Sequence, residues 1–161
     1  MNNPESAREN SFLALTRSHG ARFRRLARMY AQGGYAEDLL QEIWLQIWRS
    51  LETFKSRSTL ETWAYRIALN TCLGHRRAVR PAADSIDELT NTIAAPDIDD
   101  DFSLLEDFAA SLNAVDRAVL LLHLDDRNAD DMADIVGISP NAIAIRLTRI
   151  RKQFETRYIE E

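Results

Sequence analysis

The side chains of this chain that could do chemistry are aromatic, basic and amide groups on predicted helices. They do not form a catalytic cluster. His19, His75 and His123 are scattered along the sequence, and the single cysteine is Cys72. None of them has a cysteine or carboxylate partner at the spacing of a zinc site or a catalytic group. We therefore expect no metal, no cofactor and no enzymatic activity, and look for binding surfaces instead.

The last predicted helix carries the pattern of a DNA-binding surface. Gly137 predicts a tight turn, and Ser139 is placed to cap a helix that has Pro140 at its first position, which is typical of a helix-turn-helix. One side of this helix is apolar, and the opposite side mixes polar groups with an isoleucine. Apolar groups can meet thymine methyls in a major groove, while amides and guanidinium groups bond base edges. The residues expected on this side are Asn141, Ile145, Thr148, Arg149 and Lys152.

A second basic and aromatic stripe follows Leu60. At about 100° per residue, Arg66, Asn70 and Arg77 lie beside one another, with Trp63 and Gly74 at the rim. Such a stripe offers phosphate contacts, base-edge hydrogen bonds and stacking. The alternative is that Trp63 belongs to the core and the arginines are solvated. The expected core face of this helix is Leu60, Trp63, Ala64, Ile67 and Thr71, and its cap is Ser58, in a capping box with Glu61, or Thr59.

The segment from Ala36 to Phe54 predicts an amphipathic helix. Its expected core face is Leu39, Leu40, Ile43, Trp44, Ile47, Leu51 and Phe54. The opposite side holds Asp38, Gln41, Glu42, Leu45, Arg49 and Glu52, with Trp48 at its edge. A leucine and a tryptophan edge among charged groups are typical of a protein interface, although single exposed apolar residues are also common.

The elements that must position these surfaces are helices. Five glycines and four prolines in 161 residues favour an all-α fold of two small helical domains. Residues 1–80 carry a net charge of +6, residues 81–108 carry −9 and residues 109–161 carry −2. The acidic stretch contains prolines and small residues, so we predict domains at 1–78 and 102–161 joined by an acidic flexible linker at 79–101. A first helix is expected from Phe12 to about Ala31.

The motifs of the two halves resemble one family. DLLQEIWLQIW in the first half and MADIVGISPNAI in the second are similar to bacterial extracytoplasmic-function (ECF) sigma factors of the sigma-70 superfamily. The resemblance covers nearly the whole chain in the right order. It implies a subunit that binds core RNA polymerase, recognises the minus-10 and minus-35 promoter elements and nucleates DNA melting.

The resemblance also implies roles for individual residues. Those implied to bind the clamp of the largest polymerase subunit are Asp38, Leu39, Gln41, Glu42, Leu45, Trp48 and Arg49. Those implied at the minus-10 element are Phe54, Lys55, Arg57, Ser58, Trp63, Arg66, Asn70 and Arg77. Those implied at the minus-35 element are Asn141, Ile145, Arg146, Thr148, Arg149 and Lys152. The family further implies a contact with the flap of the second-largest subunit and an anti-sigma factor.

Three positions depart from the family pattern. Gly74, Ala144 and Ile145 stand where relatives often carry polar or basic groups, which predicts fewer charged DNA contacts. The open alternatives are a stand-alone helix-turn-helix regulator and a degenerate sigma factor that acts only by protein interaction. Neither a membrane-spanning run nor an apolar signal segment is present in the sequence, so we expect a cytoplasmic protein without membrane insertion.

Overall fold

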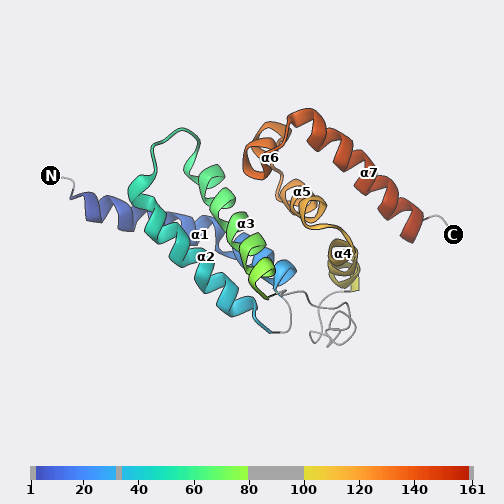
Figure 1. The fold of residues 1–161 in the computed structure, drawn as a ribbon, viewed down its shortest axis with the longest axis horizontal. Helices are drawn as coiled ribbons and strands as arrows, with labels where there is room; N and C mark the ends of the chain where they lie inside the picture. Colours follow the sequence, from blue (N-terminus) through green and yellow to red (C-terminus); the bar gives the residue numbers. More distant parts are fainter. Residues whose placement is uncertain (1–2, 32–33, 80–99, 160–161) are drawn as a thin grey trace. The chain divides into compact units, whose positions relative to one another are not determined.

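The computed structural model describes residues 3–31, 34–79 and 100–159, and within these ranges it contains helices and no strand (Figure 1). The elements are α1 (Pro4–Tyr30), α2 (Ala36–Ser50), the short 3-10 helix η1 (Leu51–Thr53), α3 (Leu60–Val79), α4 (Asp100–Ser111), α5 (Ala114–Leu124), α6 (Ala129–Val136) and α7 (Pro140–Tyr158). The all-α prediction is confirmed for this part of the chain.

The chain divides into two compact units, residues 1–91 with α1, α2 and α3, and residues 92–161 with α4 to α7. Residues 80–99, which make up most of the predicted linker, lie outside the described residues. The domain limits at residues 78 and 102 therefore stay a prediction.

In the first unit, each of the three helices packs against the other two around an aromatic centre. Phe23 on α1 is fully buried, and its ring lies 5.3 Å from that of Trp44 on α2 and 5.1 Å from that of Tyr65 on α3. Aromatic pairs in these tilted and edge-to-face arrangements add to the energy of burial. Four of the predicted core residues of α2 are buried, namely Leu39, Leu40, Ile43 and Ile47.

The predicted core face of α3 is wrong except for Ala64. The residues of α3 that are buried are Thr62, Ala64, Tyr65, Ala68, Leu69 and Cys72. Most of these side chains are small, so they permit a close approach of α3 to α1 and α2. The face is rotated by roughly a third of a turn from the prediction, which places Trp63 on the outer side of the helix. Thr59, one of the two predicted caps, accepts a hydrogen bond from the backbone amide of Thr62 at 3.2 Å.

In the second unit, α5, α6 and α7 pack against one another and α4 packs against α5. The buried guanidinium of Arg117 on α5 donates to the backbone carbonyls of Ala109 at 2.9 Å, Ala110 at 3.1 Å and Leu112 at 3.2 Å. These carbonyls lie at or just after the carboxyl end of α4, where the last carbonyls of a helix lack intrahelical donors. Arg117 therefore closes α4 and joins it to α5.

The turn between α6 and α7 has the predicted geometry. Gly137 adopts a left-handed conformation with φ of 83°, which glycine tolerates without a steric penalty. The hydroxyl of Ser139 accepts a hydrogen bond from the amide of Ala142 at 3.1 Å, and Pro140 follows as the first residue of α7. The predicted helix-turn-helix is thus formed by α6 and α7.

Candidate functional site

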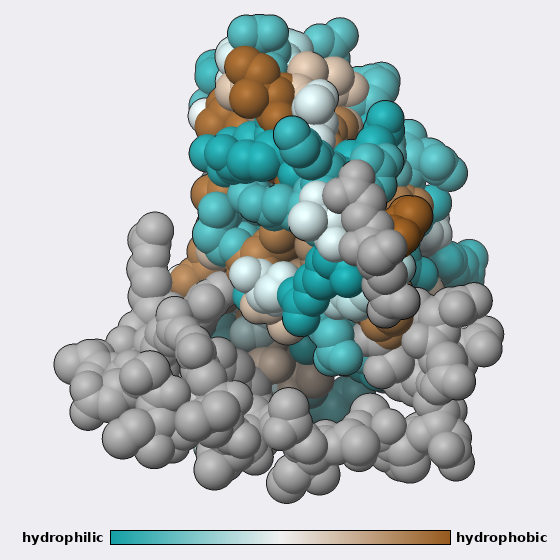
Figure 2. Space-filling model, turned by 90° about the vertical axis from the view of Figure 1, so that its right-hand side faces the viewer, coloured by the Kyte–Doolittle hydropathy of each residue, from teal (hydrophilic) through white to brown (hydrophobic). Residues whose placement is uncertain are grey.

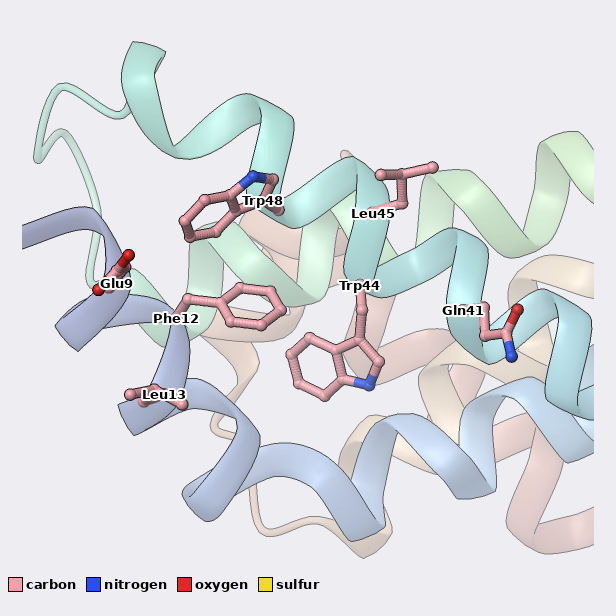
Figure 3. A pocket seen from close by; sticks show the side chains of 7 residues that line it. All are labelled: Glu9, Phe12, Leu13, Gln41, Trp44, Leu45 and Trp48. Atoms are coloured by element: carbon pink, nitrogen blue, oxygen red, sulfur yellow. The ribbon is translucent and has the colours of Figure 1, made fainter. Parts of the chain in front are cut away.

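An open apolar groove of about 570 Å³ runs between α1 and α2 on the surface of the first unit (Figure 3). Phe12 of α1 lies between the rings of Trp44 and Trp48 of α2, at centroid distances of 5.6 and 5.3 Å. The lining residues are Glu9, Phe12, Leu13, Gln41, Trp44, Leu45 and Trp48. The groove therefore offers an aromatic floor with polar groups at its rim, a combination typical of protein interfaces.

Arg8 of α1 holds Trp48 in place at one end of this groove. Its guanidinium lies 4.0 Å from the centroid of the Trp48 ring and donates to the Trp48 backbone carbonyl from Nε at 3.1 Å and from Nη2 at 2.6 Å. Nη1 donates to Glu52 at 2.8 Å. The first turns of α1 are thus tied to the end of α2 and η1, and the tryptophan is oriented by both its ring and its backbone.

The residues predicted to bind polymerase are split between this surface and the core. Exposed residues are Asp38, Gln41, Glu42, Leu45 and Arg49, while Trp48 is half-buried. Leu39 is 0% exposed and packs in the three-helix core, so its predicted place on the docking surface is corrected. An interior side chain cannot contact a partner while the unit is folded.

The part of α1 that carries Arg8 and Glu9 was not predicted, because the helix was expected only from Phe12. Asn3 caps α1 by accepting from the amide of Glu5 at 3.3 Å, and Pro4 is the first helical residue. An asparagine followed by proline and an acidic residue is a recognised start of a helix. Those three residues could have indicated the two extra turns that carry Arg8 and Glu9.

A second aromatic feature lies between η1 and α3. The rings of Phe54 and Trp63 pack at 5.0 Å, and both side chains are half-buried. The loop between them exposes Lys55 and Arg57, and Ser56 adopts a positive φ of 55°. Ser58 is half-buried, and its hydroxyl donates to the Thr59 carbonyl at 3.2 Å. The loop therefore presents two cations beside an aromatic pair that is only partly covered by its own unit.

The predicted stripe on α3 continues from this pair. Arg66, Asn70 and Gly74 are exposed at spacings that keep them on the outer side of the helix, next to Trp63. A side chain at Gly74 would meet nothing within 4 Å, so the gap in the stripe is open space. The side chain of Arg77 lies outside the described residues. The structure thus brings Trp63, Arg66 and Asn70 together as predicted.

The outer side of α7 carries most of the residues predicted to contact DNA. Asn141, Thr148, Arg149 and Lys152 are exposed, and Ile145 is 59% exposed. Over the coloured surface in Figure 2, hydrophilic residues predominate and the hydrophobic patches are separate from one another. An isoleucine this exposed among polar groups suits an apolar contact with a base methyl.

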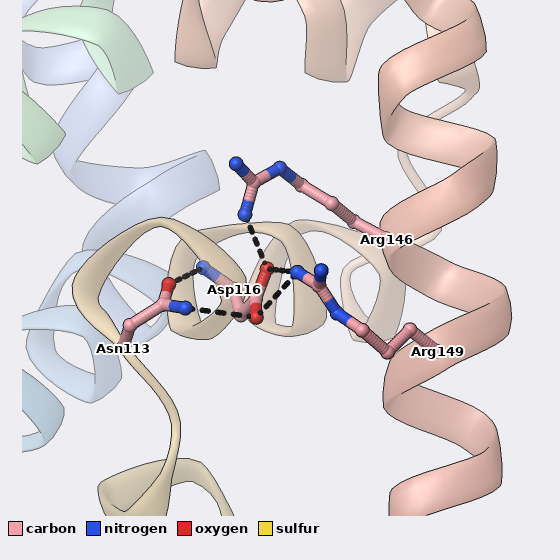
Figure 4. Close-up of polar contacts among 4 residues, drawn as sticks. All are labelled: Asn113, Asp116, Arg146 and Arg149. Carbon is pink, nitrogen blue, oxygen red and sulfur yellow. Dashed lines mark hydrogen bonds and ion pairs between the residues drawn. The ribbon is translucent and has the colours of Figure 1, made fainter.

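Two of the predicted DNA-binding arginines bind a buried carboxylate through their guanidinium groups (Figure 4). Asp116 of α5 is buried, and its carboxylate accepts from Arg146 at 2.6 Å and from Arg149 at 3.0 and 3.1 Å. Arg146 is half-buried as a result. The pairing joins residues about thirty positions apart, so helical periodicity could not predict it.

Among the described residues, no three His, Cys, Asp or Glu side chains form a group that could hold a metal ion. Cys72 is buried against the other helices, and burial raises the pKa of its thiol to about 12. Within the described part of the chain, no helix combines the length and hydropathy that crossing a bilayer requires.

Both units match families of known proteins. Residues 15–81 match the family described as sigma-70 region 2, and residues 103–154 match the family described as sigma-70, region 4. The first match covers α2 with its side of the groove, η1 and the stripe on α3, and it begins after the groove residues of α1. The second covers the helix-turn-helix and the Asp116 cluster.

The curated relatives are bacterial sigma factors. The ECF RNA polymerase sigma factor SigG of Mycobacterium tuberculosis is 35% identical over 95% of this chain and 50% of its own length. The RNA polymerase sigma factor CarQ of Myxococcus xanthus is 34% identical over 77% of this chain and 75% of its own. The chain thus spans about half the length of SigG and three quarters of CarQ.

Two solved structures share the fold. The sigma factor RpoE of Bartonella quintana, solved with the anti-sigma factor NepR, has a TM-score of 0.75 at 22% identity and covers 92% of this chain and 97% of its own. CnrH, solved with the cytosolic domain of CnrY, has a TM-score of 0.68 at 20% identity and covers 92% of this chain and 87% of its own. With two matched sigma regions in order and a relative of similar length, the chain belongs to the ECF sigma factors of the sigma-70 family.

Proposed function

We propose that this chain binds core RNA polymerase, recognises a two-part promoter and nucleates DNA melting, with no catalysis of its own. The observation that carries the proposal is the presence of distinct outward surfaces on two separately folded units. The first unit has the apolar groove and the Trp63 stripe, and the second has the outer side of α7. Such a division fits a protein that holds polymerase and two DNA elements at once.

The groove between α1 and α2 is the proposed docking surface for the clamp of the largest polymerase subunit. Gln41 and Leu45 line the groove at exposed positions, Glu42 is exposed on the same helix, and the half-buried Trp48 and Phe12 supply aromatic area. Interface energy tends to concentrate on aromatic groups surrounded by a polar rim. The residues of the proposed surface are Asp38, Gln41, Glu42, Leu45, Trp48 and Arg49, extended by Phe12 and Leu13.

The Phe54 and Trp63 pair with its neighbours is the proposed site of minus-10 melting. An unstacked base loses the stacking energy of the duplex, and an aromatic platform with hydrogen-bond donors can offset that loss. Lys55 and Arg57 are placed to contact the phosphate backbone, and Arg66 and Asn70 are placed to meet an exposed base. The proposed set is Phe54, Lys55, Arg57, Ser58, Trp63, Arg66, Asn70 and Arg77.

The outer side of α7 is the proposed surface for the minus-35 element, with the second unit also resting on the flap of the second-largest subunit. Ala144 and Ile145 are both exposed there. They make the surface more apolar and less charged, and binding that neutralises few phosphates depends weakly on salt. We expect upstream recognition in which base contacts outweigh phosphate contacts.

An anti-sigma factor is a further proposed partner. RpoE and CnrH, whose folds resemble this one, were each solved with a bound partner protein, NepR and the cytosolic domain of CnrY. The open aromatic groove of this chain is a surface that a regulator would need to cover in order to block polymerase. With this function, the protein would act in the cytoplasm, where polymerase is found.

The test is transcription from a genomic promoter pool by the purified chain with core polymerase. Sequencing the starts should yield promoters with a shared pair of elements. A pool from which core polymerase with this chain starts no more transcripts than core polymerase alone would reject the proposal.

A degenerate sigma factor is the second candidate, favoured by the acidic groups near the helix-turn-helix. Asp126, Asp130 and Asp134 are exposed there, and they would repel phosphate. Polymerase binding without open-complex formation would support this candidate. A stand-alone regulator would instead shift duplex DNA in a gel without polymerase.

A further inference from the structure

We propose that Asp116 is a positioning residue for promoter recognition, which holds Arg146 and Arg149 in the geometry that selects bases in the upstream element. This inference rests on the proposed function of α7. It concerns a residue on α5 that lies beneath the DNA-facing surface and is itself too buried to touch DNA, with 3% of its area exposed.

The carboxylate of Asp116 is held from several directions (Figure 4). Oδ1 accepts from Arg146 Nη1 at 2.6 Å and from Arg149 Nη2 at 3.1 Å. Oδ2 accepts from Arg149 Nη2 at 3.0 Å and from Asn113 Nδ2 at 3.0 Å. Charge-assisted bonds of this kind are short and directional, so they restrict the planes of both guanidinium groups.

The position of Asp116 is in turn set by the start of α5. Its backbone amide donates to Asn113 Oδ1 at 2.8 Å, which caps the helix, and the side chain of Asn113 returns a bond to the carboxylate. A carboxylate in the first turn of a helix is also favoured by the helix dipole. The anchor for the arginines therefore belongs to a rigid element.

Both arginine side chains remain partly exposed although their guanidinium groups bind this buried carboxylate. The side chain of Arg146 is 30% exposed and that of Arg149 is 49% exposed, whereas that of Asp116 is 4% exposed. Within the described part of the chain, Arg149 uses only Nη2 for its bonds to Asp116. Its Nε and Nη1 stay available to a base edge, on the same side of α7 as Ile145.

The burial of Asp116 favours positioning over competition with DNA. If both arginines left to bind phosphate, the carboxylate would remain charged in the interior with the amide of Asn113 as its side-chain donor among the described residues, which is strongly unfavourable. The arginines should therefore stay paired when DNA binds. Two cations on one carboxylate also leave a net positive charge facing outward.

The test compares Asp116→Asn with the matched variant Asp130→Asn, each as full chain with core polymerase. Asp130 is an exposed carboxylate in the first turn of α6. Its substitution by asparagine removes the same charge from the same unit. The readout is the ratio of transcription from a promoter with the preferred upstream element to transcription from the same promoter with that element scrambled. We expect Asp116→Asn to lower this ratio about tenfold, because a well-placed guanidinium discriminates between bases. Asp130→Asn should leave the ratio unchanged, and polymerase affinity should be the same in both.

The remaining outcomes distinguish a failure of this inference from a failure of the proposed function of α7. If Asp116→Asn keeps the wild-type ratio, or strengthens binding to all sequences alike, Asp116 competes with DNA or is only structural, and the inference is overturned. If the wild-type protein itself shows no upstream preference, the proposed function of α7 fails and the inference fails with it. Should Asp116→Asn unfold, Asp116→Glu keeps the charge but displaces the carboxylate by one methylene. It must then reduce the ratio without weakening polymerase binding, and an unchanged ratio rejects the inference.

Discussion

Arg8 and Trp48 are joined twice, by a guanidinium that lies 4.0 Å from the centroid of the indole ring and by hydrogen bonds from the same group to the Trp48 carbonyl. The two residues lie forty positions apart, on α1 and α2. The pair fixes one wall of the apolar groove, which would lower the ordering cost of the proposed docking.

Replacing Arg8 with alanine should therefore act on both folding and docking. We expect the free energy of unfolding of the first unit to fall by about 1–2 kcal/mol, as a cation–π contact and hydrogen bonds are lost. The affinity for core polymerase should fall as Trp48 becomes mobile. Urea unfolding and a polymerase-binding titration measure the two effects. Arg17→Ala, which removes an exposed arginine from the same helix, is the control and should change neither quantity.

Substitutions at Leu45 and Leu39 distinguish the proposed docking surface from the core, because Leu45 is exposed and Leu39 is buried. Leu45 is 40% exposed at the groove, so Leu45→Ala should weaken polymerase binding by about 1–2 kcal/mol with little effect on stability. Leu39 is fully buried, so Leu39→Ala should lower the free energy of unfolding by about 2–5 kcal/mol. Binding titrations and urea unfolding on both variants test this contrast. Equal loss of polymerase affinity in the two folded variants would argue against the groove as the docking surface.

Trp63 should matter for melting more than for initial promoter binding. Trp63→Ala removes the ring that packs on Phe54 at 5.0 Å, and the loss of one stacking partner is expected to cost open-complex formation about 1–3 kcal/mol. Permanganate reactivity of thymines in the minus-10 element measures the opening. A promoter with a pre-opened mismatch at that element should restore activity.

Tyr35→Ala is the control for Trp63, because it removes an exposed aromatic residue from the same unit but outside the stripe. If both variants open the duplex normally, the aromatic pair is not a base platform. If both fail equally, the defect lies in folding and not in melting.

Cys72 gives a prediction about pH. Burial raises the pKa of its thiol from 9.0 to about 12 in the folded state. The neutral thiol is therefore favoured by folding, and this contribution to stability is present below pH 9 and is lost as the pH rises toward 12. The difference in unfolding free energy between the wild type and Cys72→Ala should be constant below pH 9 and shift against the wild type above it. At about pH 8 a thiol reagent should also modify the folded protein roughly a thousandfold more slowly than the unfolded chain.

Local features of the fold could be predicted from the sequence because they depend on a few adjacent residues. Gly137, Ser139 and Pro140 have the conformations and bonds that their types favour, so the start of α7 was predicted correctly. The outer side of α2 was also predicted well, since large apolar residues mark its core face.

The face of α3 shows where that reasoning fails. Its buried side includes the small residues Ala64, Ala68 and Cys72. A prediction based on hydrophobicity instead places the large residues Trp63 and Ile67 in the core. Small residues are buried there because three helices approach closely, and that requirement is set by α1 and α2. The pairing of Asp116 with Arg149 was missed for a similar reason, because it depends on how α5 and α7 cross.

The buried Arg117 has a consequence for the motions of the second unit. Separating α4 from α5 would leave the last carbonyls of α4 and a guanidinium without their mutual bonds, so fraying of α4 by itself is unfavourable. The two helices should instead open to solvent together, as one cooperative unit with a common protection against amide exchange. A load applied to α4 would then pass to α5 without first unravelling α4.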